Sequence, residues 1–169
     1  AFCGLMSVNQ GADGIPHRIG GVICDMATAL YAFQALSTAL YARRDEEKGR
    51  LIETNLMQGA ACLGVIRMMM VHLENGAYIV GRVPAGVLEA SDGHITILMY
   101  RDQEFPKLCD VLGLPEMGAN PRYATNAQRV EHEVEIMPDI MAAFRQQTCA
   151  DLSAKLTDAR ILHERVNSY

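Results

Sequence analysis

The chain has 169 residues, of which half are apolar and 21% are charged, the composition of a folded protein and not of a disordered one. This length suffices for one domain or slightly more. The formal net charge of −5 excludes a general attraction to nucleic acid or to an anionic membrane, so an anionic ligand would need a few well-placed arginines.

The first elements in chain order are a glycine-rich loop and a long apolar helix. Residues 1–23 contain five glycines and Pro16, which predicts a loop, and Asp25 borders the start of the helix that follows. The run Met26–Ala42 is apolar nearly all round, but it is short for a bilayer span and is interrupted by polar residues. It therefore predicts a helix that is covered on every side and that ends by Gly49. So short a chain cannot cover such a helix, which implies a partner subunit or missing neighbours.

A short strand, a second helix and a linker are expected next. LIETNL at 51–56 alternates like a strand, and Met57–Glu74 has apolar residues at helical spacing. Residues 77–86 contain Gly81, Pro84 and Gly86 and are predicted to link a first part, 1–76, to a second, 87–169.

A hairpin is the clearest local signal in the second part. Two alternating runs, Val87–Ala90 and His94–Tyr100, flank Asp92-Gly93, a pair typical of tight turns with positive φ angles. A helix over Glu104–Leu112 should follow, with Gly113 as its end. Asp102, between strand and helix, could orient a substrate or act as the helix N-cap.

The segment NPRYATN at 120–126 predicts a turn that runs into a helix. Thr125 and Gln128 have the spacing of a capping box, and Pro138 should kink or restart the helix. The predicted apolar stripe of this helix consists of Val130, Val134, Met137, Met141 and Phe144. Arg122 and Arg129 could grip a carboxylate or phosphate, but a turn so rich in polar residues favours a structural role for both.

A last helix is predicted over Ala150–Asp158, capped by Thr148, and no regular element is expected after it. The chain is therefore expected to have an α/β (α+β) fold, in which long buried helices lead into a small domain with a short antiparallel sheet and several helices.

The cysteines and histidines do not form a metal-binding pattern. The five cysteines are odd in number, widely spaced and without a CxxC pair, which predicts buried free thiols in a reducing cytoplasm. No His-x3-His pair occurs, so no metal site is expected.

Six segments in chain order resemble the middle portion of the family III CoA-transferases, the family of the formyl-CoA and carnitine CoA-transferases. The matching segments are GLMSVNQG, ATALYAFQALSTALYAR, EKGRLIETNLMQGA, EASDGHITI, RDQEFPKLCDVLGLPEM and NPRYATNAQRVEH. The resemblance implies the end of a Rossmann-like large domain, a linker and a small α/β domain, in enzymes that form interlocked dimers.

The chemistry that the resemblance implies is covalent. An aspartate carboxylate attacks an acyl-CoA thioester, and the enzyme then carries CoA as a thioester. By resemblance that aspartate, most of the CoA-binding surface and the segment that completes the large domain lie outside these residues, so no catalytic residue is expected within the chain. Gly81, Arg82, Gly86 and Asp102 are the candidates for the substrate cleft, whereas Arg122, Arg129, Thr125, Gln128, Asp92 and Gly93 are expected to be structural.

The sequence thus predicts a truncated CoA-transferase module that is inactive by itself and belongs to a cytoplasmic enzyme using CoA and a carboxylic acid. It should pair with a second copy or a large domain, and bind neither nucleic acid nor membrane. Two alternatives remain open: a stand-alone, non-catalytic dimeric binding protein, and a fragment of an α-methylacyl-CoA racemase-like enzyme.

Overall fold

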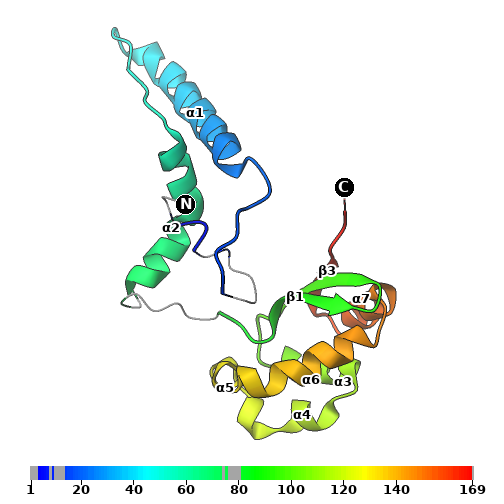
Figure 1. Ribbon diagram of the computed structural model, residues 1–169. Coiled ribbons are helices and arrows are strands. Elements are labelled where there is room, and N and C mark those ends of the chain that lie inside the picture. Colours follow the sequence, from blue (N-terminus) through cyan, green and yellow to red (C-terminus); the bar gives the residue numbers. More distant parts are fainter. Residues whose placement is uncertain (1–3, 8, 10–13, 74, 76–80, 169) are drawn as a thin grey trace. The chain divides into compact units, whose positions relative to one another are not determined.

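The chain forms two compact units, Ala1–Tyr78 and Ile79–Tyr169. The structure is a computed structural model and describes residues 4–7, 9, 14–73, 75 and 81–168 (Figure 1). Each unit is treated by itself below.

Unit 1 is built from two helices that pack side by side (Figure 1). Helix α1 (Ile23–Ala42) continues into a 3-10 turn, η1 (Arg43–Asp45), and α2 (Leu56–Leu73) packs on α1 through small residues. A Cβ atom on Gly59 would lie 2.9 Å from the backbone nitrogen of Thr28. Glycine is therefore required at this crossing, because any side chain would push the helices apart.

Two predictions for unit 1 are wrong. The first helix ends at Ala42 and not at Gly49, since η1 tightens its last turn. The segment Leu51–Asn55 is not a strand. Instead the Asn55 side chain accepts a bond of 2.9 Å from the Gln58 N–H, and the Gln58 side chain accepts one of 3.2 Å from the Asn55 N–H, so this segment caps α2.

Large apolar side chains are exposed over most of α1 and α2. On α1 only Ala27 is buried, and on α2 only Gly59, Ala60 and Gly64 are. By length and composition both helices could cross a membrane, but core helices of soluble proteins pass the same test. Within the described residues, nothing covers the exposed set: Val22, Ile23, Met26, Leu30, Tyr31, Phe33, Leu36, Leu40, Tyr41, Leu56, Met57, Leu63, Val65, Ile66, Met68, Met69, Met70 and Leu73.

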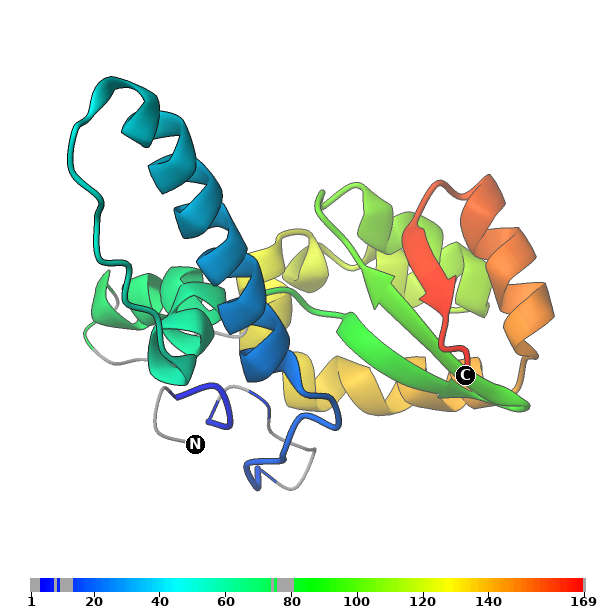
Figure 2. The ribbon, with the colours of Figure 1, turned by 90° about the horizontal axis from the view of Figure 1, so that it is seen from above.

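Unit 2 contains a three-stranded antiparallel sheet in the order β1-β2-β3 (Figure 2). Strands β1 (Ala85–Ala90) and β2 (Gly93–Leu98) form the predicted hairpin, and β3 (Leu162–Arg165) pairs with β2. The expectation of no regular element near the end of the chain is therefore wrong. The four residues of β3, of which only Leu162 is apolar, gain their bonds from a strand more than 60 positions earlier, and their own sequence pattern does not reveal this pairing.

The hairpin turn differs from the predicted one, because neither Asp92 nor Gly93 has a positive φ angle. The turn is held from outside instead. The backbone N–H and hydroxyl of Ser91 donate to the Gln147 carbonyl at 2.9 and 3.0 Å, and the Asp92 carboxylate accepts from the Cys149 N–H at 2.6 Å. Asp92 thus satisfies a free N–H at the start of the last helix.

Asp92 should make the stability of unit 2 dependent on pH. The hydrogen bond from the Cys149 N–H holds the pKa of Asp92 below its ordinary value. A carboxyl whose folded pKa is depressed contributes stability above its unfolded pKa, about 3.9, and loses it as pH falls through the lower folded value. Thermal unfolding should therefore show Asp92→Ala less stable than wild type near pH 7, with the gap closing below about pH 4. Asp110→Ala, an exposed control on helix α3 (Glu104–Leu112), should show no such gap, and a gap independent of pH would contradict the assignment.

The helices of unit 2 are α3 (Glu104–Leu112), α4 (Pro115–Ala119), η2 (Pro121–Tyr123), α5 (Asn126–Glu131), α6 (Glu133–Arg145) and α7 (Cys149–Asp158). The predicted ends of α3 and α7 are confirmed. Gly113 ends α3 with a left-handed φ of 74°, and the Thr148 hydroxyl accepts from the Asp151 N–H at 3.1 Å.

The helix predicted after Thr125, with a kink or restart at Pro138, is two helices that are broken at His132 instead. Pro138 lies inside α6. The break shifts the helical phase, so the buried face of α6 consists of Ile136, Ile140, Ala143 and Phe144, while Val134 is 91% exposed. The expected stripe through Val134 is therefore wrong.

The core of unit 2 lies between the sheet and its helices. Leu88, Ile95 and Ile97 of the sheet pack with buried side chains of α3, α6 and α7. Cys109 and Cys149 are buried free thiols in this core, as predicted, but Cys62 in unit 1 is exposed.

Thiol labelling should separate these cysteines. Burial raises the pKa of Cys109 to about 12 and also raises the pKa of Cys149, so both are protonated and shielded at neutral pH. Treatment of the folded protein with N-ethylmaleimide followed by peptide mass spectrometry should modify Cys62 first and leave Cys109 and Cys149 unmodified until urea is added. Equal labelling rates for Cys62 and Cys109 in the folded protein would contradict this placement.

Candidate functional site

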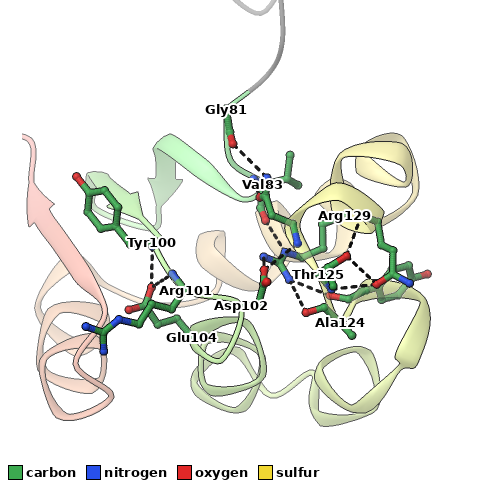
Figure 3. Close-up of polar contacts among 12 residues, drawn as sticks. Gly81, Val83, Tyr100, Arg101, Asp102, Glu104, Ala124, Thr125 and Arg129 are labelled. Atoms are coloured by element: carbon green, nitrogen blue, oxygen red, sulfur yellow. Dashed lines mark hydrogen bonds and ion pairs between the residues drawn. The ribbon is translucent and has the colours of Figure 1, made fainter.

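A buried guanidinium organises the polar interior of unit 2. The side chain of Arg129, on α5, is only 1% exposed. Its Nε donates to the Val83 carbonyl at 2.8 Å, and its Nη1 donates to the carbonyls of Tyr123 and Ala124 at 2.9 and 3.3 Å (Figure 3). The guanidinium also lies over the Phe105 ring, 4.8 Å from its centre. Arg129 therefore bonds the free carbonyls of the turn before α5, the structural role that the sequence favours.

Asp102 is the counter-ion of Arg129. One oxygen, Oδ1, accepts from Nη2 of Arg129 at 2.8 Å and from the backbone N–H of Asn126 at 2.7 Å. The Asp102 side chain is 47% exposed, so solvent screens its attraction to Arg129. Asp102 therefore acts more by fixing the positions of its two donors than by its charge. The structure thus brings together two residues that the sequence singled out separately and places Asp102 at the first residue of α5.

The predicted N-cap role of Asp102 is wrong, because the N-cap position of α3 is Gln103. The turn between β2 and α3 is closed by Glu104, whose Oε2 accepts from the N–H groups of Tyr100 and Arg101 at 2.8 and 3.1 Å (Figure 3).

Asn126 is a member of this cluster that sequence reasoning missed. Its Oδ1 accepts from the Val83 N–H and its Nδ2 donates to the Gly81 carbonyl, each at 3.1 Å. The sequence signals are its place directly after the helix cap and at the end of the segment NPRYATN. Thr125 and Gln128 form the reciprocal capping box that starts α5 beside it.

Arg122 makes a separate and exposed contact on the same turn. It forms a two-pronged pair with Glu135, with both N···O distances 3.1 Å, and the Tyr123 hydroxyl donates to Glu135 at 2.7 Å. The hydrogen bond from Tyr123, then the Arg122 guanidinium, hold the pKa of Glu135 below its ordinary value, while the same bond raises the pKa of Tyr123. Arg122 thus ties the turn to α6.

The remaining cleft candidates lie at the start of unit 2. Arg82 is half-buried and follows Gly81, whose carbonyl is bound by Asn126. Gly86, inside β1, has a φ of +103°, a conformation that other residues rarely adopt. Among the described residues, no three His, Cys, Asp or Glu side chains are grouped as a metal site would require. The polar side chains of this region therefore bind the backbone of segment 81–83, and Arg82 is the candidate to bind a ligand.

Comparison with known proteins assigns the family. The family model for CoA-transferase family III matches residues 1–169. The chain is 29% identical over 174 aligned residues to mouse succinyl-CoA:glutarate CoA-transferase, covering 99% of this chain and 40% of that protein. It is likewise 29% identical to the acetyl-CoA:oxalate CoA-transferase of Acetobacter aceti, covering 89% of this chain and 40% of that protein.

A solved structure supports the same assignment. The crystal structure of a CaiB/BaiF family protein from Brucella suis matches with a TM-score of 0.83 and 25% identity, covering 99% of this chain and 46% of that one. The chain thus spans less than half the length of these relatives. It belongs to CoA-transferase family III.

Proposed function

We propose that this chain is part of an enzyme that moves CoA between an acyl-CoA and a carboxylic acid, and that it is inactive without the rest of that enzyme. Its family membership and its span of 40% of the mouse relative support this proposal. The nucleophilic aspartate and most CoA contacts would lie in the part that these residues do not include. In the complete enzyme that aspartate would attack the thioester carbon and carry the acyl group before CoA returns.

The observation that carries the proposal is the uncovered apolar surface of α1 and α2. Phe33 and Leu40 of α1 and Ile66 of α2 are 68%, 55% and 75% exposed, far more apolar surface than a finished domain leaves open. Further protein, either a large domain or a second copy, would cover these faces. We favour further protein over a membrane as the cover of these helices, because the chain belongs to CoA-transferase family III and matches only 40% of the mouse and of the Acetobacter aceti relative. More than half of each of these two relatives therefore lies outside the matched part and could supply the cover.

Unit 2 would cover the acyl-CoA cleft and shape the pocket for the acid. The names of the relatives above include glutarate and oxalate, both dicarboxylic acids, so we propose a dicarboxylic acid as the acceptor. Arg82 is the candidate to pair with its second carboxylate, because Arg129 is consumed by backbone contacts and Asp102 is an anion. We also propose a cytoplasmic location, which the buried free thiols Cys109 and Cys149 would suit.

A non-catalytic protein that pairs through α1 is the alternative that the exposed helices also suit. One experiment separates the two. Two proteins are compared: the chain alone, and a longer polypeptide that also includes the segments encoded on both sides of it. Each is titrated with CoA in a calorimeter and assayed for CoA transfer from succinyl-CoA to labelled glutarate. The longer polypeptide should bind CoA and transfer it, and the chain alone should not transfer it. A soluble longer polypeptide that neither binds CoA nor transfers it would exclude the transferase.

A further inference from the structure

The backbone just before β1 is bound by side chains where the sheet ends. The pairing of β1 with β2 stops at Ala85 and Leu98. Val83 lies beyond that end but is only 1% exposed, so its N–H and carbonyl need partners inside the protein.

Two side chains of α5 supply those partners. Asn126 accepts from the Val83 N–H at 3.1 Å, and Arg129 donates to the Val83 carbonyl at 2.8 Å. Asn126 also donates to the Gly81 carbonyl at 3.1 Å. One residue bonded through both its N–H and its carbonyl is the pattern that a neighbouring strand provides. Asn126 and Arg129 thus replace a strand at this point.

A single carboxylate oxygen binds the backbone of Asn126 and the side chain of Arg129. Asp102 Oδ1 accepts from the Asn126 backbone N–H at 2.7 Å and from Arg129 Nη2 at 2.8 Å (Figure 3). Asp102 therefore ties the first residue of α5 to Arg129, beside the capping box that already restrains the backbone. The arrangement leaves segment 81–83 little freedom relative to α5.

We propose that Asn126 and Arg129 are positioning residues that clamp segment 81–83 and thereby fix the backbone from which Arg82 extends. Arg82 lies between the two clamped residues, so the direction of its side chain depends on their bonds. If Arg82 pairs with the carboxylate of the acceptor, a consequence that rests on the proposed function, the clamp sets the affinity for that acid without touching it.

Hydrogen exchange on the 169-residue chain tests the clamp. In Asn126→Ala the Val83 amide should exchange about tenfold faster, since it loses its acceptor, while amides of β2 keep their protection. Arg122→Ala is the matched control, because Arg122 lies on the same turn and binds Glu135 instead. Asn126→Ser, which is tolerated at a helix start but too short to reach both groups, serves if the alanine variant does not fold. An unchanged Val83 rate in a folded variant overturns the clamp.

Steady-state kinetics on the longer polypeptide test the consequence. Asn126→Ala and Arg82→Gln should each raise KM for the acid about tenfold with a smaller effect on KM for acyl-CoA, and Arg122→Ala should do neither. Faster Val83 exchange with an unchanged KM for the acid overturns the positioning of Arg82. Absence of any transfer by the wild-type polypeptide overturns the proposed function and leaves the exchange result standing as the test of the clamp.

Discussion

Arg129→Met should destabilise unit 2 by about 2–4 kcal/mol, the largest effect expected of a single polar substitution in this chain. Methionine keeps the packing of the stem near Phe105 but cannot donate, so the carbonyls of Val83 and Tyr123 lose their bonds in a buried place. The lost ion pair adds little, because Asp102 is 47% exposed and screened. Hydrogen exchange of the buried β2 amides in rising urea measures the loss within unit 2 alone.

The same substitution at Arg122 is the control. Arg122→Met also removes one positive charge from the turn, but its pair with Glu135 is exposed, and exposed pairs contribute little. The β2 amides should then open with nearly the wild-type free energy. Equal losses in the two variants would mean that charge, and not the buried hydrogen bonds, stabilises the turn.

The chain alone should self-associate, and polar substitutions on unit 1 should reverse this. Phe33 and Ile66 are exposed on α1 and α2, and each apolar side chain of this size contributes about 1.5–3 kcal/mol when it is buried. We expect sedimentation velocity to show concentration-dependent association of the wild-type chain, and a shift of the double variant Phe33→Gln with Ile66→Gln towards the monomer.

The matched control is Val134→Gln, since Val134 is 91% exposed on α6 as a single apolar residue. It should leave the association unchanged. In the longer polypeptide the double variant should lower Tm, because further protein would cover the two side chains there. A wild-type chain that sediments as a monomer at all concentrations would contradict the inference that these faces are covered by protein.

The parts of the fold that the sequence predicts correctly have local causes. The hairpin alternates around a short turn, Gly113 ends α3, and Thr148 starts α7 with its own hydroxyl. Thr125 and Gln128 are only three residues apart, so their capping box is visible in the sequence. In each case the determining contact joins residues close together in the chain.

The parts that it misses depend on contacts between distant residues. The hairpin turn takes its form from Gln147 and Cys149, and the pairing of Asp102 with Arg129 joins the turn before α3 to helix α5. Both members of that pair are prominent in the sequence, yet nothing in their spacing indicates that they meet. Asn126 is missed for the same reason, since its partners lie more than 40 positions away.

The pairing of β3 with β2 affects how unit 2 folds during synthesis. At about 5–20 residues per second, the ribosome needs roughly 3–13 s to pass from Leu98 to Leu162. During that interval one edge of β2 has no partner, and unpaired strand edges promote aggregation. Incomplete chains that end before Leu162 should therefore bind chaperones more than complete chains do.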